Sequence, residues 1–235
     1  GVITPVLKAG DFTGKEGSTL LIYLSGKKEK RLLFLGLGPE TSCSLEILRR
    51  SFGAAMKRCH IKKWPHINVI LPKLKHFDVN EVIRAMTEGM GLCSYVFEDW
   101  KSKKEPYYVK KITLIGAKDP KIAKKTENVL SGVHLARDLI NGNALDITPQ
   151  ALAEEVKRIA AQFPKVKATV LTKKQIEREK MGLLLAVASG SQVDPALIMA
   201  EYRGDPKSDD LTMIVGKGIT FDTGGVNLKP TKFIE

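Results

Sequence analysis

The chain has 235 residues, of which 43% are hydrophobic and 27% charged, and its formal net charge at pH 7 is +12. This composition is typical of a globular protein with a packed core, and it excludes disordered and collagen-like chains. The longest uncharged stretch, residues 181–193, is broken by glycines and falls short of the roughly 20 apolar residues that a membrane-spanning helix needs. Cys43, Cys59 and Cys93 have no closely spaced partners, and no secretory signal is visible, so we expect a cytoplasmic protein without a membrane anchor.

The positive charge is distributed unevenly along the chain. Residues 1–140 hold 25 basic and 14 acidic side chains, whereas residues 141–235 hold 13 and 12. A strongly basic region can bind nucleic acid. However, the clusters Lys101–Lys104 and Lys121–Lys125 lack a convincing aromatic stacking platform and are more typical of a solvated face. From the sequence we therefore expect no nucleic-acid partner.

The first part of the chain alternates short apolar runs with amphipathic stretches, which predicts an α/β domain with a mixed sheet. The predicted strands cover residues 19–24, 31–37, 67–71 and 109–115, the first two forming a hairpin, and the predicted helices cover residues 44–57 and 79–97. A long helix is predicted over residues 120–140. It should end at Asn141-Gly-Asn143, because glycine and asparagine favour the left-handed backbone that closes a helix.

The second part is predicted to be another α/β unit. Thr148 and Pro149 mark a helix start, because a threonine hydroxyl can cap free amides and proline fits the first helical turn. The expected elements are a helix at 149–163, a strand at 166–172, a helical piece at 173–180, an apolar run at 183–188, and strands at 196–202 and 211–215. We therefore divide the chain into an N-terminal α/β domain at 1–119, a connecting helix at 120–142, and the opening portion of a second α/β domain at 143–235.

The segment with the most chemical content is residues 216–230, Gly-Lys-Gly-Ile-Thr-Phe-Asp-Thr-Gly-Gly-Val-Asn-Leu-Lys-Pro, placed directly after a predicted strand. Loops at the carboxyl ends of strands commonly hold the sites of α/β proteins. The segment is not a phosphate-binding P-loop, because Gly218 follows Lys217 where a serine or threonine is required. It is not a dinucleotide fingerprint either, because Phe221 stands where the third glycine should be. Lys217, Asp222 and Lys229 are its candidate functional groups, although by themselves they are more typical of a solvated glycine-rich turn.

This segment resembles the hallmark of the M17 leucyl aminopeptidase family, the cytosol aminopeptidases. That hallmark is a strand ending in Val-Gly-Lys-Gly, then Thr-Phe-Asp-Ser-Gly-Gly, then a lysine, and here Thr223 replaces the usual serine. Residues 181–191 and 197–202 resemble the family's approach to its metal loop, and residues 136–141 resemble its inter-domain junction. The resemblance is specific from about residue 134 onward, whereas the first part is similar only in architecture.

The resemblance implies a metal-dependent aminopeptidase that releases N-terminal residues, with leucine preferred, from peptides with a free N-terminus. It makes Lys217 and Asp222 metal ligands and Lys229 the catalytic lysine that polarises the scissile carbonyl. It also implies two divalent ions (Zn²⁺, or Mn²⁺ or Mg²⁺ at an exchangeable position) and a homohexamer. No residue is assigned to an organic cofactor.

The family's remaining ligands, another Asp and an Asp-x-Glu-x-Arg motif whose arginine holds a bicarbonate ion, would lie beyond Glu235. One Asp and one Lys cannot complete two metal sites, since a single catalytic zinc normally has three protein ligands. We therefore expect these residues alone to be inactive. The alternative is a non-catalytic homologue whose basic N-terminal domain binds nucleic acid or supports assembly.

Overall fold

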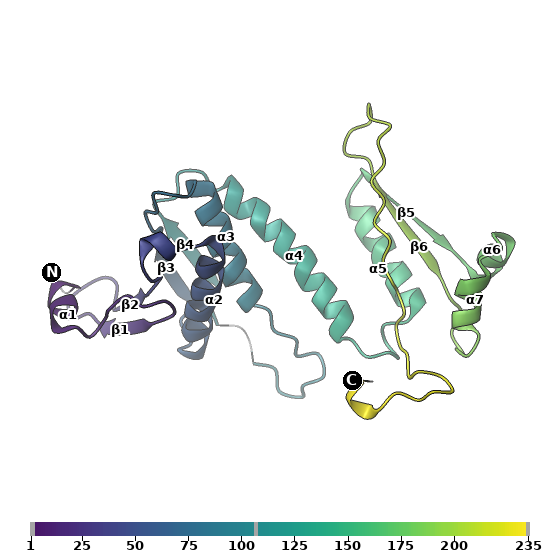
Figure 1. Cartoon of the computed structure of the whole chain (residues 1–235), viewed down its shortest axis with the longest axis horizontal. Coiled ribbons are helices and arrows are strands. Elements are labelled where there is room, and N and C mark those ends of the chain that lie inside the picture. The colour runs from purple at the N-terminus through teal and green to yellow at the C-terminus, as the bar shows by residue number, and fades with distance from the viewer. Residues whose placement is uncertain (1–2, 106–107, 234–235) are drawn as a thin grey trace. The chain divides into compact units, whose positions relative to one another are not determined.

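A computed structural model describes residues 3–105 and 108–233 of the chain (Figure 1). The chain forms two compact units, Gly1–Asp138 and Leu139–Glu235. Each unit combines helices with small sheets, which confirms the predicted α/β fold class.

The first unit contains two short sheets and three long helices. Its elements are α1 (Ile3–Ala9), β1 (Thr19–Tyr23), β2 (Arg31–Leu35), α2 (Leu45–Ile61), β3 (His66–Ile70), α3 (Val79–Cys93), β4 (Lys111–Ile115) and α4 (Lys121–Asn141), the last of which runs into the second unit. Strands β1 and β2 pair antiparallel as the predicted hairpin, with Tyr23 opposite Arg31. Strands β3 and β4 pair in parallel, with His66 opposite Lys111. The first unit thus has antiparallel and parallel pairing in two separate two-stranded sheets, rather than in the single mixed sheet that was predicted.

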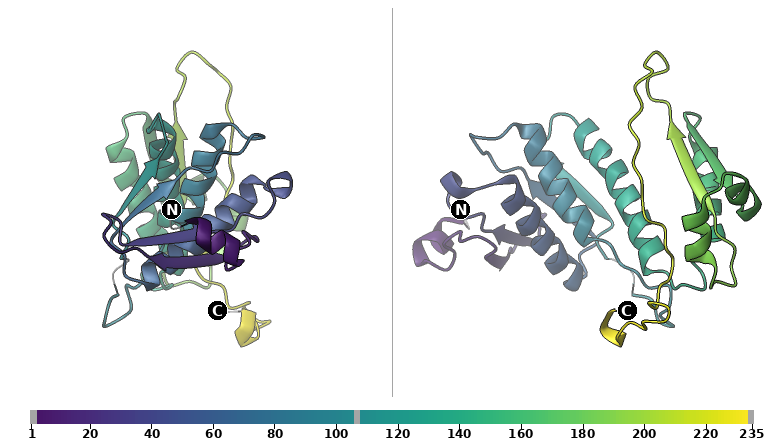
Figure 2. Two further views of the ribbon diagram at one scale, coloured as in Figure 1. Left: turned by 90° about the vertical axis from the view of Figure 1, so that its left-hand side faces the viewer. Right: turned by 45° about the vertical axis from the view of Figure 1, so that its right-hand side comes forward.

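Helices α2 and α3 lie side by side and form the core of the first unit (Figures 1 and 2). The apolar face predicted on α2 is buried there, since Leu48 is fully inaccessible and Phe52 and Met56 are nearly so. Helix α3 contributes Val82, Ala85, Met86 and Met90 to the same cluster. Burial of these side chains at helical spacing explains why both helices form where the sequence pattern places them.

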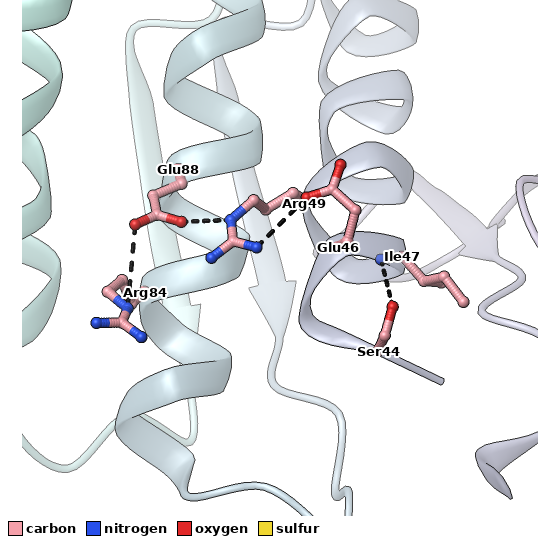
Figure 3. A network of polar contacts seen from close by, with 6 residues as sticks. All are labelled: Ser44, Glu46, Ile47, Arg49, Arg84 and Glu88. Atoms are coloured by element: carbon pink, nitrogen blue, oxygen red, sulfur yellow. Dashed lines mark hydrogen bonds and ion pairs between the residues drawn. The ribbon is translucent and has the colours of Figure 1, made fainter. Parts of the chain in front are cut away.

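A polar network links the two helices at the edge of this core (Figure 3). The Arg49 Nε donates to the Glu88 carboxylate at 2.5 Å, and Arg84 approaches the same carboxylate at 4.0 Å. This partly buried hydrogen bond from Arg49 to Glu88 is the main reason why the pKa of Arg49 is raised. At the start of α2, the Ser44 hydroxyl accepts from the Ile47 amide at 3.1 Å, which caps the helix.

The cysteines of the first unit are free thiols, and two of them are buried. Burial raises the pKa of Cys59 to about 11 and also raises the pKa of Cys43. Both thiols therefore stay protonated at neutral pH, which makes them poor nucleophiles and metal ligands.

The second unit pairs one antiparallel sheet with one long helix. Its elements are α5 (Pro149–Gln162), β5 (Val166–Leu171), α6 (Lys173–Arg178), α7 (Gly182–Ala188), β6 (Leu197–Tyr202) and a short 3-10 turn at Thr231–Phe233. Strands β5 and β6 are antiparallel, and α5 packs against β5. The predicted helix start is confirmed, because the Thr148 hydroxyl accepts from the Ala151 amide at 3.2 Å.

Three local predictions need correction. The predicted strand at 211–215 does not form: those residues carry no strand, and the side chains of Leu211 and Met213 through Val215 are at least 74% exposed. Helix α3 ends at Cys93 rather than continuing to residue 97. Helix α4 ends at Asn141 as expected. However, Gly142 is not among the described glycines with a positive φ, so the left-handed backbone predicted to close the helix is not found at that glycine.

Within the described part of the chain, we find no helix with the length and apolar character to cross a bilayer.

Candidate functional site

The three candidate residues lie on the segment after β6, which runs from residue 203 to 230 without a helix or a strand. Lys217 and Asp222 are exposed, and Lys229 is partly buried. Figures 1 and 2 show this segment as an extended trace that turns near its C-terminal end. The three candidate residues therefore lie on one long irregular segment.

Asp222 and Lys229 form the centre of this loop. The Lys229 Nζ donates to Asp222 Oδ2 at 2.6 Å and approaches the Asp222 carbonyl oxygen at 3.3 Å. The Gly224 amide donates to Asp222 Oδ1 at 2.8 Å, and the Lys229 amide donates to the Thr223 carbonyl oxygen at 2.8 Å. Each carboxylate oxygen of Asp222 thus has its own donor, and the chain returns on itself between residues 222 and 229.

Gly224 makes this return possible. Its φ is +91°, a left-handed conformation that side chains other than glycine rarely adopt. A Cβ atom placed there would collide with the Asn227 carbonyl oxygen and would lie 3.0 Å from the Lys229 amide nitrogen. The glycine is needed because the backbone approaches itself closely here. In contrast, a Cβ added to Gly216 or Gly218 would meet open space.

The electrostatics of the loop favour the ionised form of Asp222. The hydrogen bond from Lys229 is the main cause that lowers the pKa of this carboxyl, followed by the hydrogen bond from the Gly224 amide. The positive charge of Lys217 lowers the pKa further. Asp222 is therefore a carboxylate at neutral pH, which is the state that a cation ligand requires.

The structure brings two of the three predicted residues together. Asp222 and Lys229 are in direct contact, whereas Lys217 acts on Asp222 only through its charge. The sequence reasoning missed the ion pair itself and the role of the Gly224 amide. A signal for the second was present, since an Asp-x-Gly sequence favours a turn in which the carboxylate accepts the second following amide, whereas no local signal indicates the ion pair.

The donor set fits a divalent cation only in part. The Asp222 carboxylate is a suitable oxygen ligand, and a lysine amine can ligate once it has lost its proton. However, no group of three or more His, Cys, Asp or Glu side chains among the described residues is placed to hold a metal ion. The described residues alone therefore do not form a metal site, and a complete site would need additional ligands.

Comparison with protein families places both parts of the chain in one family. Residues 1–104 match the N-terminal domain of the cytosol aminopeptidase family, and residues 134–235 match its catalytic domain. The candidate loop lies inside the second of these matches.

Individual relatives agree with this result. A probable cytosol aminopeptidase of Protochlamydia amoebophila is 45% identical over 98% of this chain and 47% of the relative. One of Chlamydia abortus is 42% identical over 94% of this chain and 46% of the relative. The chain therefore spans about half the length of the curated relatives that it matches.

Solved structures share the fold. The Mn complex of the bottromycin maturation enzyme BotP is 25% identical with a TM-score of 0.83, over 99% of this chain and 48% of that one. A mutant of tomato leucine aminopeptidase is 26% identical with a TM-score of 0.79, over 95% of this chain and 46% of that one. Together with the two domain matches, these similarities show that the chain belongs to the cytosol aminopeptidase family.

Proposed function

We propose that the protein formed with this chain is a metal-dependent aminopeptidase that releases N-terminal residues from peptides, with leucine preferred. The observation that carries the proposal is the Asp222–Lys229 pair, held at 2.6 Å in a loop that lies within the catalytic-domain match. A carboxylate and an ammonium group on one short loop can serve a cation and a developing oxyanion, respectively. Membership of the family does not favour the alternative of a non-catalytic homologue.

Asp222 and Lys217 are the proposed metal ligands of this chain. Because its pKa is lowered, Asp222 is already an ionised carboxylate at neutral pH. Lys217 must bind as a neutral amine, which burial and neighbouring dications would favour in the whole protein. The chemistry that a pair of divalent ions supplies there is Lewis-acid activation of water and of the peptide carbonyl. Zn²⁺ is the ion we propose, with Mn²⁺ or Mg²⁺ at an exchangeable position.

Lys229 is the proposed catalytic residue. In the described structure its ammonium group is held by the Asp222 carboxylate and lies near the Asp222 carbonyl oxygen. If Asp222 held a metal ion, its carboxylate would be a weaker acceptor for Lys229, and the ammonium group would be available to donate to the carbonyl oxygen of a bound peptide. A positive charge at that place stabilises the oxyanion that forms when the carbonyl is attacked.

Further properties of the whole protein belong to the same proposal. We propose a cytoplasmic homohexamer, with the bicarbonate-binding arginine and the remaining metal ligands supplied by residues outside this chain. The substrates are peptides whose free amino group is recognised at the metal site.

Leucine amide hydrolysis tests the proposed function directly. We expect the whole protein to release ammonia from leucine amide, to lose this activity after dialysis against a chelator, and to regain it with Zn²⁺ or Mn²⁺. The 235-residue chain alone should remain inactive under the same conditions, because it carries too few ligands. Full activity of the chelated, metal-free protein would contradict metal dependence.

Replacing Lys229 should separate turnover from metal binding. We expect Lys229→Ala in the whole protein to lower kcat by about 100- to 1000-fold, the usual effect of losing one oxyanion-stabilising donor. Metal content, measured by plasma mass spectrometry, should stay close to that of the parent protein. Lys207→Ala, an exposed lysine on the same segment, is the matched control and should leave both quantities unchanged. A Lys229→Ala protein with unchanged kcat would remove Lys229 from the mechanism.

A further inference from the structure

One end of the two-stranded sheet in the second unit places two basic residues opposite each other. Val166 of β5 pairs with Tyr202 of β6 at this end, and one residue further the Arg203 amide donates to the Lys165 carbonyl oxygen at 3.0 Å. Opposite residues of an antiparallel pair project from the same face, and like charges in such a pair are destabilising. An anion bound between Lys165 and Arg203 would relieve this repulsion.

The next pair on the same face supplies a third cation and the one carboxylate of this region. Lys167 lies opposite Glu201. The Glu201 carboxylate accepts from Arg203 Nε at 2.6 Å, and this hydrogen bond is the main cause that lowers the pKa of Glu201, to which the charge of Lys167 also contributes. Among the described residues, neither Lys165 nor Lys167 has a carboxylate within ion-pair distance. Positive charge is therefore in excess here.

These four charged residues line a hollow with a volume of about 400 Å³. Pro164, Val166 and Pro206 complete its lining. The volume lies within the range of roughly 300 to 1,000 Å³ that is usual for small-molecule sites. The Lys165 Nζ donates to the Gly204 carbonyl oxygen at 3.2 Å, which holds the ammonium group against the end of the neighbouring strand. The hollow thus combines excess positive charge with apolar side chains.

We propose that this hollow binds a phosphate dianion, with Lys165 and Arg203 as its ligands. Three basic side chains against one acidic side chain leave a formal charge of +2, which matches a dianion. Glu201 occupies the Arg203 Nε, so the terminal N–H groups of the guanidinium remain for the planar, two-point contact that arginine makes with phosphate. The ligand is free phosphate or a phosphomonoester whose organic group lies against the prolines. No residue of the hollow belongs to the loop at 216–230, so the proposal does not depend on the proposed peptidase chemistry.

NMR titration of the full chain with inorganic phosphate tests the proposal, at about pH 8, where phosphate is mainly a dianion. We expect the backbone amide signals of Lys165, Lys167 and Arg203 to shift saturably, with a Kd on the order of 1 mM. A parallel titration with phenyl phosphate identifies the source of the dianion. Tighter binding of phenyl phosphate would assign the hollow to phosphomonoesters, and equal binding would assign it to free phosphate.

Charge variants separate this site from general attraction to a basic protein. Lys165→Gln/Arg203→Gln should weaken phosphate binding at least about fivefold, because both charged donors are lost. Glu201→Gln should strengthen it about twofold or more, because the negative charge is removed while an acceptor for Arg203 Nε remains. Lys174→Gln/Lys180→Gln changes two exposed lysines of the same unit and should leave the Kd within about twofold of the parent value. Circular dichroism should show that all variants are folded.

Three results would overturn the proposal. They are the absence of saturable shifts at the amides of the hollow, shifts confined to the first unit, and an equal loss of affinity in the two double variants. Weaker binding by Glu201→Gln than by the parent chain would also contradict it, since the carboxylate would then be a positive contributor to the site.

Discussion

Asp222→Asn in the whole protein is expected to reduce leucine amide hydrolysis to below about 1% of the parent activity and to lower metal content as well. Asparagine keeps the size of the side chain and one acceptor oxygen for the Gly224 amide, but it removes the negative charge. Losing even an outer-shell partner of a metal ligand typically weakens metal affinity 10- to 100-fold, so losing a proposed ligand should cost more. This result differs from that expected for Lys229→Ala, in which metal is retained.

Asp205→Asn is the matched control for this experiment. Asp205 is exposed on the same segment and accepts from the Lys207 amide at 2.9 Å, in the same kind of local turn that Asp222 makes with Gly224 at 2.8 Å. The two substitutions therefore perturb similar turns, and only one touches a proposed ligand. An Asp222→Asn protein that keeps its metal and its activity, or an Asp205→Asn protein that loses both, would contradict the assignment of Asp222.

Much of the fold was predictable because local signals and burial agree. The apolar spacing on α2 coincides with the face that packs in the core, where Leu48 and Met56 are buried. Thr148 and Pro149 mark the start of α5 because capping depends only on neighbouring residues. The hairpin between residues 19 and 35 is likewise a local structure, and its two strands pair antiparallel as expected.

The strand predicted at 211–215 was wrong for a physical reason. An apolar run such as Leu211–Val215 becomes a strand only when a neighbouring strand satisfies its backbone hydrogen bonds. Among the described residues of the second unit, β5 and β6 pair only with each other, and the run remains unpaired and exposed. Periodicity shows that a segment can form a strand, whereas the partner that makes it one is set by tertiary structure.

The sequence indicates candidate site residues, which stay a prediction, but it does not indicate how they are arranged. Lys217, Asp222 and Lys229 were identified through a family resemblance, and no local rule states that two of them form an ion pair. That pair depends on the left-handed Gly224, which turns the chain so that residue 229 returns to residue 222.

Helices α2 and α3 approach each other closely at Gly89, a steric constraint that the sequence pattern does not indicate. A Cβ atom at this position would collide with the Arg49 carbonyl oxygen and lie 2.8 Å from the Arg49 Cα atom. These are backbone atoms of α2, so no side-chain rotation can relieve the contact. The neighbouring bond from Arg49 to Glu88 also holds the two helices together at this level (Figure 3). Any side chain at residue 89 must therefore push the helices apart and loosen the core around Met86.

Gly89→Ala is consequently expected to destabilise the first unit by about 2 to 3 kcal/mol, even though alanine is the better helix former. Thermal unfolding followed by circular dichroism should show a melting temperature lower by roughly 10 °C. Gly132→Ala is the matched control, because Gly132 lies on α4 with open space around its Cβ position. That change should stabilise the chain by up to about 1 kcal/mol, as expected from helix propensity alone. Equal melting temperatures for Gly89→Ala and Gly132→Ala would show that the helices can separate at this point without loss of core packing.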